Sequence, residues 1–264
     1  FGILMAFLSN WLLRDVGDNA WRWMMGSEAF PAFAYTLACL TIPESPRWLL
    51  DRGRVDDAKV VLRSAAPDAS AAETDRFAAQ VRAADATAAG HSSLLDPQLR
   101  RPVLLAFLIA FFNQLSGINA VLYFAPRIFE MAGLGEKSAL LQSIGIGITN
   151  LVATFVGLWL IDRLGRRTLL AIGSVGYIVS LGLTAWAFFT GHMAIVPACI
   201  FAFIAAHAVG QGAVIWVFIS EIFPDRARAA GQALGSGTHW VFAALLTTFF
   251  PQMVASLPPG WVFA

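Results

Sequence analysis

Amide, hydroxyl and indole side chains gather at a few positions inside otherwise apolar stretches of this 264-residue sequence. The densest group, five polar residues within eleven positions, consists of Asn113, Gln114, Ser116, Asn119 and Tyr123. Later apolar stretches add Asn150, Trp216, His239 and Trp240. Amides and hydroxyls offer paired donors and acceptors, and an indole offers a flat apolar face. Together they match a neutral polyhydroxylated ligand, such as a sugar, better than an ion.

A simpler interpretation is that these groups only hydrogen-bond between packed helices, as Ser, Asn and Gln often do in membrane bundles. For one residue alone the two interpretations are balanced, but the cluster at 113–123 favours a binding group. A membrane enzyme would need a clustered nucleophile, a metal site or an acid–base pair. His207 and His239 stand alone in their apolar stretches, so we expect no enzyme, no metal site and no cofactor.

Charged motifs stand at the ends of the apolar stretches. Asp162, Arg166 and Arg167 flank a turn at Gly165, and Glu221 ends a later stretch. Carboxylates and guanidiniums at adjacent helix ends can form paired hydrogen bonds that latch one face of a bundle. The alternative, that the positive residues only anchor the topology, stays open on chemistry alone.

The composition indicates what must position these residues. Of all residues 58% are hydrophobic and 13% are charged, and the mean hydropathy is +0.66. Of the 18 basic and 17 acidic residues, 16 lie between positions 51 and 102. A soluble domain carries about 25% charged residues, so the composition excludes a globular cytosolic enzyme. The net charge of +1 and the two isolated cysteines exclude a nucleic-acid binder and a secreted disulfide scaffold.

Seven apolar segments fit helices that cross a bilayer, which requires about 20 apolar residues each. The segments are 1–13, 23–42, 103–131, 138–161, 168–190, 194–222 and 230–254. We expect the first to be truncated, and the sequence to be an internal piece of a longer protein. Segment 103–131 would be about 43 Å long as one straight helix, so it must tilt, overhang or break. It contains Gly117 and Pro126.

The basic residues orient these segments. One side of the predicted membrane carries 14 Lys and Arg residues and the other carries 4, which predicts that the charged loop between the second and third segments is cytoplasmic. Ser70 and Glu73 have the spacing of a capping box, and 52–66 has helical periodicity. We expect short surface helices there, and favour a solvated spacer over a regulatory role.

Four motifs resemble those of the sugar porter family of the major facilitator superfamily. They are Pro-Glu-Ser-Pro-Arg-Trp-Leu at 43–49, Gln-Leu-Ser-Gly-Ile-Asn at 114–119, Asp-Arg-Leu-Gly-Arg-Arg at 162–167 and Glu-Ile-Phe-Pro at 221–224. The resemblance implies an all-α integral membrane protein with a partial major facilitator fold, seven of twelve transmembrane helices with one truncated. Residues 1–43 would end the amino-terminal half, 44–102 would form the cytoplasmic helical linker, and 103–264 would belong to the carboxy-terminal half.

The resemblance also implies roles for individual residues. It assigns substrate binding to the polar and indole side chains Asn113, Gln114, Asn119, Tyr123, Asn150, Trp216, His239 and Trp240. It assigns a conformational latch to the charged residues Glu44, Arg47, Asp162, Arg166, Arg167 and Glu221. Three positions depart from the family's pattern: Asn113 replaces the first of two glutamines, Ala213 replaces a proline hinge, and His239 adds a titratable group.

The expected function is therefore transport of a neutral monosaccharide, a hexose in first place, by alternating access in the plasma (inner) membrane. The expected partners are the sugar, the lipid bilayer and, in the case of symport, protons; no nucleic acid is expected. Coupling stays open, because the family's protonatable carboxylate lies in its first helix. A non-transporting sugar sensor on the same fold is the alternative.

Overall fold

The computed structural model describes residues 1–67, 70–87 and 94–264, and within these ranges it contains helices and turns but no β-strand. The contacts divide the chain into two compact units. One unit comprises Phe1–Met25 together with Ser93–Ala264, and the other comprises Gly26–Ser92. The all-α prediction is confirmed.

The larger unit is a bundle of long helices. Its helical segments are α1 (Gly2–Leu13), α2 (Ala20–Gly26, whose last residue falls in the smaller unit), η1 (Pro97–Leu99), α7 (Arg100–Leu115), α8 (Ile118–Tyr123), α9 (Ala125–Met131), α10 (Glu136–Leu164), α11 (Arg166–Thr190), η2 (Met193–Ile195), α12 (Val196–His207), η3 (Ala208–Gly212), α13 (Val214–Ile222), α14 (Asp225–Ser256) and α15 (Pro259–Val262). In the described part of the chain, five stretches are long and apolar enough to cross a membrane: Pro97–Tyr123, Glu136–Leu164, Arg166–Thr190, Met193–Ile222 and Asp225–Ser256. They coincide with the last five predicted spans.

The second predicted span is not continuous. Residues 23–42 contain the end of α2 (Ala20–Gly26) and the separate helix α3 (Ala29–Cys39), so one unbroken helix over this segment was wrong. Gly26 and Ser27 are weak helix formers, and Glu28 is costly to dehydrate. Pro31 lacks an amide hydrogen and is tolerated in the first turn of α3, where no intrahelical acceptor is needed.

The third predicted span breaks, which is one of the three alternatives that its length left open. Gly117 adopts a φ of +82°, and α7 ends just before it. A side chain would be strained at this φ, so glycine permits the chain to restart as α8 in a new direction. A second break falls at Phe124, and Pro126 then lies in the first turn of α9. The amide-rich segment 113–119 therefore spans a helix end and a helix start.

Small residues bring the helices of the bundle close together. A Cβ on Gly210 of η3 would lie 2.5 Å from the Cα of Gly173 on α11, and one on Gly157 of α10 would lie 2.9 Å from the carbonyl oxygen of Val209. Backbones can approach this closely only where both surfaces lack bulky side chains. The π-helical turn η3 is therefore held between α10 and α11.

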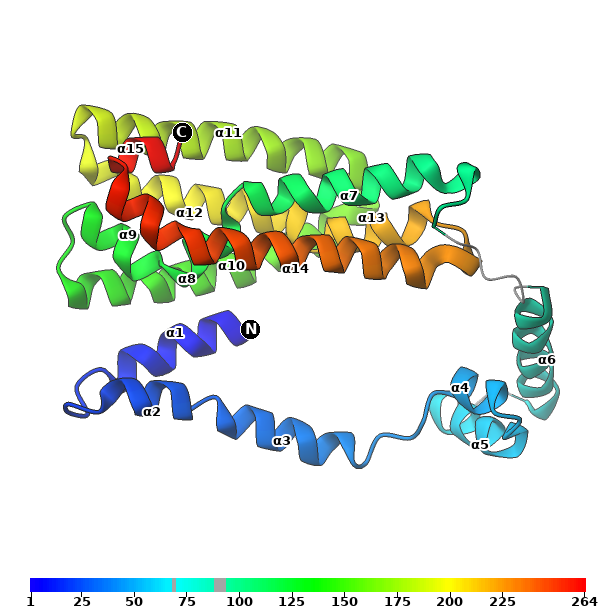
Figure 1. Cartoon of the computed structure of the whole chain (residues 1–264). Helices are drawn as coiled ribbons and strands as arrows, with labels where there is room; N and C mark the ends of the chain where they lie inside the picture. The colour runs from blue at the N-terminus through cyan, green and yellow to red at the C-terminus, as the bar shows by residue number, and fades with distance from the viewer. Residues whose placement is uncertain (68–69, 88–93) are drawn as a thin grey trace. The chain divides into compact units, whose positions relative to one another are not determined.

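Helices α7 and α14 run side by side (Figure 1), and they make one of the most extensive contacts in the bundle. Helix α14 also approaches α13 closely at Gly235, where a Cβ would lie 2.7 Å from the Cδ1 of Ile219. This packing brings the end of α7 opposite the middle of α14, although more than a hundred residues separate them in the sequence.

The smaller unit contains α4 (Pro46–Asp51), α5 (Val55–Ala65) and α6 (Ala71–Thr87) in addition to α3. These helices bury Leu49, Leu50, Ala58 and Ala78 in a small core. The short surface helices expected in the charged loop are therefore present. The predicted continuation of the alanine-rich helix to residue 89 lies outside the described residues.

The predicted capping box begins α6. The Glu73 amide donates to the Ser70 hydroxyl at 3.2 Å, and the Ser70 amide donates to the Glu73 carboxylate at 2.8 Å. These reciprocal bonds satisfy amides that have no partner inside the helix. The bonds from the Ser70 amide and hydroxyl also hold the pKa of Glu73 below its ordinary value.

Candidate functional site

The packing of α7 against α14 brings Gln114 into contact with His239. The Gln114 side-chain nitrogen lies 2.9 Å from Nδ1 and 3.0 Å from Nε2 of His239. The Gln114 oxygen accepts a hydrogen bond from Asn119 at 3.1 Å. Because an amide nitrogen only donates, the ring nitrogen that accepts this bond carries no proton. Three of the predicted sugar-binding residues thus meet at one point.

The three residues of this group differ in how far they are buried. Gln114 is fully buried, while Asn119 and His239 are half-buried and cover it. Interhelical hydrogen bonds in membrane proteins contribute about 0.6 kcal/mol on average, so these bonds hold the helices together only weakly. A ligand hydroxyl can replace a bond of this strength at little cost, and the group is therefore suited to exchange partners with a polar ligand.

Two indoles flank His239. The ring centroid of Trp216 on α13 lies 5.0 Å from that of His239 in an edge-on arrangement, and the Trp240 centroid lies 5.1 Å from it, also edge-on. Trp216 is half-buried, whereas Trp240 is 58% exposed. The polar group therefore has an apolar aromatic border with one accessible indole, the combination that a sugar ring requires.

Asn113 occupies a different position from the rest of the predicted set. It is 2% exposed, and its amide nitrogen donates to the Gln211 oxygen at 3.3 Å. Gln211 in turn donates to the Ser174 hydroxyl on α11 at 3.1 Å. Our sequence reasoning missed Gln211, although an amide between two glycines inside an apolar span was a visible signal.

The remaining two predicted residues are not joined to the polar group. Tyr123, at the end of α8, is 60% exposed. Asn150, on α10, is half-buried, and its side chain makes no hydrogen bond with any described residue. Among the described residues, the hydrogen bonds of Gln114, Asn119 and His239 include neither of the two side chains.

His207, which the sequence leaves isolated, has a partner on the neighbouring helix. The hydroxyl of Tyr177 on α11 lies 2.5 Å from His207 Nδ1 at the end of α12, and the two rings stack with centroids 6.0 Å apart. His207 therefore packs α12 against α11. Among the described residues no group of three or more potential ligands could hold a metal ion.

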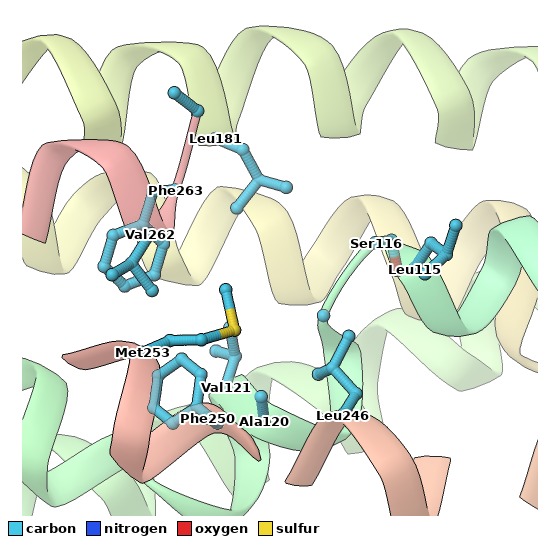
Figure 2. Close-up of a pocket in the computed structure, with 12 residues that line it drawn as sticks. Leu115, Ser116, Ala120, Val121, Leu181, Leu246, Phe250, Met253, Val262 and Phe263 are labelled. Carbon is cyan, nitrogen blue, oxygen red and sulfur yellow. The ribbon is translucent and has the colours of Figure 1, made fainter. Parts of the chain in front are cut away.

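Two cavities lie close to the polar group but are mainly apolar. The first, of about 200 Å³, is bordered by Ser116, by Leu246, Phe250 and Met253 of α14, and by residues near the carboxy terminus (Figure 2). The second, of about 790 Å³, lies between α7 and α11 and reaches Ser174 and Tyr177. Neither is lined by Gln114 or His239, so these cavities are separate from the amide and indole group.

The predicted latch residues are only partly connected. Arg166 at the start of α11 binds Glu221 at the end of α13 through two nitrogens, at 2.8 and 3.1 Å, and also contacts Asp162 at 3.2 Å. Arg167 is exposed and makes no ion pair with a described residue. Gly165, with a φ of +79°, forms the tight turn that brings Arg166 and Asp162 together.

Two other latch residues, Glu44 and Arg47, are exposed at the start of α4 in the smaller unit. Glu44 precedes α4, and Arg47 follows Pro46 in its first turn.

The sequence as a whole, residues 1–264, matches the family described as "Sugar (and other) transporter". The chain belongs to this sugar transporter family. Its membership agrees with the amide and indole group and with the four motifs. The relatives are transporters, which excludes the alternative of a membrane enzyme.

Individual members of the family are similar along almost the whole chain. A glucose transporter of Staphylococcus epidermidis is 33% identical over 99% of this chain and 59% of its own length. A D-xylose–proton symporter of Escherichia coli is 31% identical over 96% of this chain and 52% of its own length. The chain thus spans between half and three fifths of these two relatives.

Solved structures agree with the fold. The xylose transporter XylE of Escherichia coli, in a partially occluded inward-open conformation, superposes with a TM-score of 0.83 at 27% identity, covering 98% of this chain and 56% of XylE. The chain therefore has part of the major facilitator fold and is a multi-pass protein of the plasma membrane.

Ala213 stands where the family's pattern has a proline. The helix is irregular here without the proline, because the preceding turn η3 is π-helical.

Proposed function

We propose that the protein carries a neutral monosaccharide, with a hexose as the first candidate, across the plasma membrane by alternating access. The observation that carries this proposal is the contact of Gln114 with Asn119 and His239 beside two indoles. The group contains donors, acceptors and flat apolar faces but no carboxylate or basic side chain other than the imidazole, which suits a ligand without charge.

Binding begins at the accessible part of the group. The exposed indole of Trp240 stacks on the apolar face of the sugar, and Asn119 and His239 meet its hydroxyl groups. A sugar hydroxyl then replaces His239 as the acceptor for the buried Gln114 nitrogen. Gln114 thus exchanges one acceptor for another, and its nitrogen is not left without a hydrogen bond. Trp216 supports the His239 ring from behind.

The other predicted residues join as the site closes. The left-handed Gly117 is the point at which α8 can rotate relative to α7, and this rotation brings Tyr123 over the ligand. Asn150 faces the ligand from α10, and Asn113 acts through the neighbouring Gln114. The movement converts an open group into an enclosed one, as alternating access requires.

The charged residues control the cytoplasmic side. The ion pair between Arg166 and Glu221, with Asp162 and Arg167 beside it, holds the helix ends together in the outward-facing state and breaks when that side opens. Glu44 and Arg47 do the same for the amino-terminal half, to which residues 1–43 belong. Residues 44–102 form the cytoplasmic linker to the carboxy-terminal half, 103–264.

The proposal extends to proton symport. Relatives of this chain are described as a D-xylose–proton symporter and an arabinose–proton symporter, at 31% identity each. An inwardly directed proton gradient should therefore accelerate uptake and permit accumulation of the sugar. The same rate with and without a gradient would indicate facilitated diffusion instead.

Uptake of radiolabelled D-glucose and D-xylose by the full-length protein in proteoliposomes tests the transport function. Gln114→Ala and Asn119→Ala should each abolish saturable uptake, because each removes a hydrogen bond to the sugar. Ser143→Ala is a matched control, since the buried Ser143 hydroxyl donates only to a carbonyl of its own helix, at 2.9 Å, and this variant should transport normally.

The outcomes separate the site from the function. Normal uptake by both Gln114→Ala and Asn119→Ala would overturn the assignment of the site. Sugar binding by the unmodified protein without any uptake would favour the sensor alternative, and the absence of both binding and uptake would overturn the sugar function itself.

A further inference from the structure

A buried amide outside the proposed contact residues is connected to them. Gln211 lies in η3, is 8% exposed, and both accepts from Asn113 at 3.3 Å and donates to Ser174 at 3.1 Å. Its side chain thus bridges α7 and α11. Gln211 borders a mainly apolar cavity of about 220 Å³ together with Ser174 and Tyr177, and its hydrogen bonds go to Asn113 and Ser174 rather than to Gln114, Asn119 or His239.

The backbone before Gln211 is packed tightly against α11. A Cβ on the preceding Gly210 would lie 2.5 Å from the Cα and 2.7 Å from the nitrogen of Gly173, and 2.7 Å from the Leu169 carbonyl oxygen. The Gln211 side chain itself packs over Gly173, with its Cγ 3.0 Å from the place of a Cβ there. A backbone that cannot shift presents its amide at one position, which is the property needed to orient another side chain.

The hydrogen bonds continue from Gln211 to the site. The Asn113 oxygen, turned away from Gln211, accepts from the Gln114 nitrogen at 3.4 Å, and that nitrogen also faces His239. Among the described residues the Asn113 nitrogen donates to Gln211 alone. Without the Gln211 oxygen, the buried Asn113 nitrogen would lose its hydrogen-bond acceptor among the described residues. The Asn113 side chain could then rotate out of the orientation in which its oxygen accepts from Gln114.

We propose that Gln211 is a positioning residue of the sugar site, which orients Gln114 through Asn113 and thereby determines how strongly one particular sugar hydroxyl is recognised. The proposal rests on the proposed function, because it concerns the same site. A simple interhelical tie would affect the stability of the bundle but would leave the preference among sugars unchanged, so the two roles are distinguishable.

The test compares D-glucose with its monodeoxy analogues as competitors for uptake by the full-length protein in proteoliposomes. For the unmodified protein, the hydroxyl that Gln114 binds is the one whose removal weakens competition about tenfold, the effect of about one hydrogen bond. In Gln211→Leu the KM for glucose should rise about tenfold, and the penalty for this one analogue should disappear. The penalties for the other analogues should remain within about twofold of those for the unmodified protein, and so should kcat.

A length-exchanged pair tests the bond itself. Gln211→Asn shortens the bridge and should raise KM, whereas Gln211→Asn combined with Asn113→Gln restores the combined length of the two amides and should recover KM to within about threefold. Ser143→Ala is again the matched control, because the buried Ser143 hydroxyl donates only to a carbonyl of its own helix, at 2.9 Å. Size-exclusion chromatography of each variant verifies folding.

The same analogue penalties in Gln211→Leu as in the unmodified protein, an unchanged KM, or failure of the paired exchange to restore KM would overturn the role of Gln211 while leaving the sugar function intact. An unmodified protein that neither binds nor transports D-glucose or D-xylose would overturn the proposed function, and with it this proposal.

Discussion

Single residues in this protein acquire their roles from the partner that faces them. His239 and His207 are both histidines within predicted spans, yet His239 meets Gln114 between two indoles whereas His207 meets the Tyr177 hydroxyl between two helices. The first arrangement can exchange partners with a ligand, and the second fastens a helix pair. The side-chain type alone does not distinguish these roles.

Ser70 and Glu73 permit a prediction about pH. Because hydrogen bonds from Ser70 lower the pKa of Glu73, this carboxylate stabilises α6 above its ordinary pKa of 4.5, and the stabilisation is lost as the pH falls through the lowered folded-state value. Ser70→Ala removes the hydroxyl but keeps the backbone amide, which is the larger cause of the shift. We expect it to raise the pKa of Glu73 part of the way towards 4.5.

Carbon-13 NMR of the glutamate carboxyl groups, with Glu73→Gln to assign the resonance, measures this pKa. An unchanged pKa in Ser70→Ala would contradict the role of the hydroxyl. Ser64→Ala is a suitable control, because its hydroxyl donates to a carbonyl of α5, at 2.7 Å, and has no bond to Glu73.

At the scale of elements, the irregular turns decide where the polar side chains lie. The left-handed Gly117 separates α7 from α8 and allows Asn119 to return to Gln114. The π-helical turn η3 aims Gln211 at Asn113 while small residues hold its backbone between α10 and α11. Regular helices at either place would point these side chains elsewhere, because helical side chains repeat at a fixed angle.

Gly210→Ala tests the close approach of η3 and α11. The added methyl group would meet the backbone of Gly173 and Leu169 rather than a flexible side chain, so the helices must separate. We expect a loss of about 1–3 kcal/mol in the free energy of unfolding, as for other overpacked sites, measured by denaturant unfolding of the detergent-solubilised protein.

Gly182→Ala, on α11, is the matched control, because a Cβ there meets no atom within 4 Å. It should unfold at the same denaturant concentration as the unmodified protein or slightly higher. Equal stability of the two variants would show that η3 and α11 are not in close contact.

At the scale of the whole molecule, transport requires two arrangements of similar free energy. An ion pair joins Arg166 at the start of α11 to Glu221 at the end of α13. Both side chains are partly exposed, Arg166 to 30% and Glu221 to 47%. Exposed pairs contribute about 0.2–1 kcal/mol. That is too little to lock the protein in one state and enough to bias an equilibrium between two.

Glu221→Gln should therefore shift the population towards the cytoplasm-open state by up to about fivefold. Hydrogen–deuterium exchange around 161–167 and 219–224 should become faster, and the rate of sugar uptake should fall. Glu130→Gln is the control, because Glu130 pairs with Arg127 within α9 and its carboxylate joins no separate elements among the described residues. Equal exchange in Glu221→Gln and the unmodified protein would contradict the latch.

Much of this protein follows from its sequence. Apolar segments of about 20 residues must be helices, because lipid offers no partners for backbone amides and carbonyls. The length of segment 103–131 required a tilt, an overhang or a break, and the structure shows a break at Gly117, one of the two residues noted inside it. The capping box at Ser70 was also predicted from the sequence, because its hydrogen bonds join residues only three positions apart.

The tertiary structure decided the rest, because contacts between residues far apart in the sequence depend on how helices pack. It joined Gln114 to His239 and Asn113 to Gln211, across 125 and 98 positions, and it left Asn150 and Tyr123 outside that group. It also divided the predicted span 23–42 into two helices. Periodicity shows which residues can face a neighbour, whereas only the packing of small residues determines which neighbour comes within hydrogen-bonding distance.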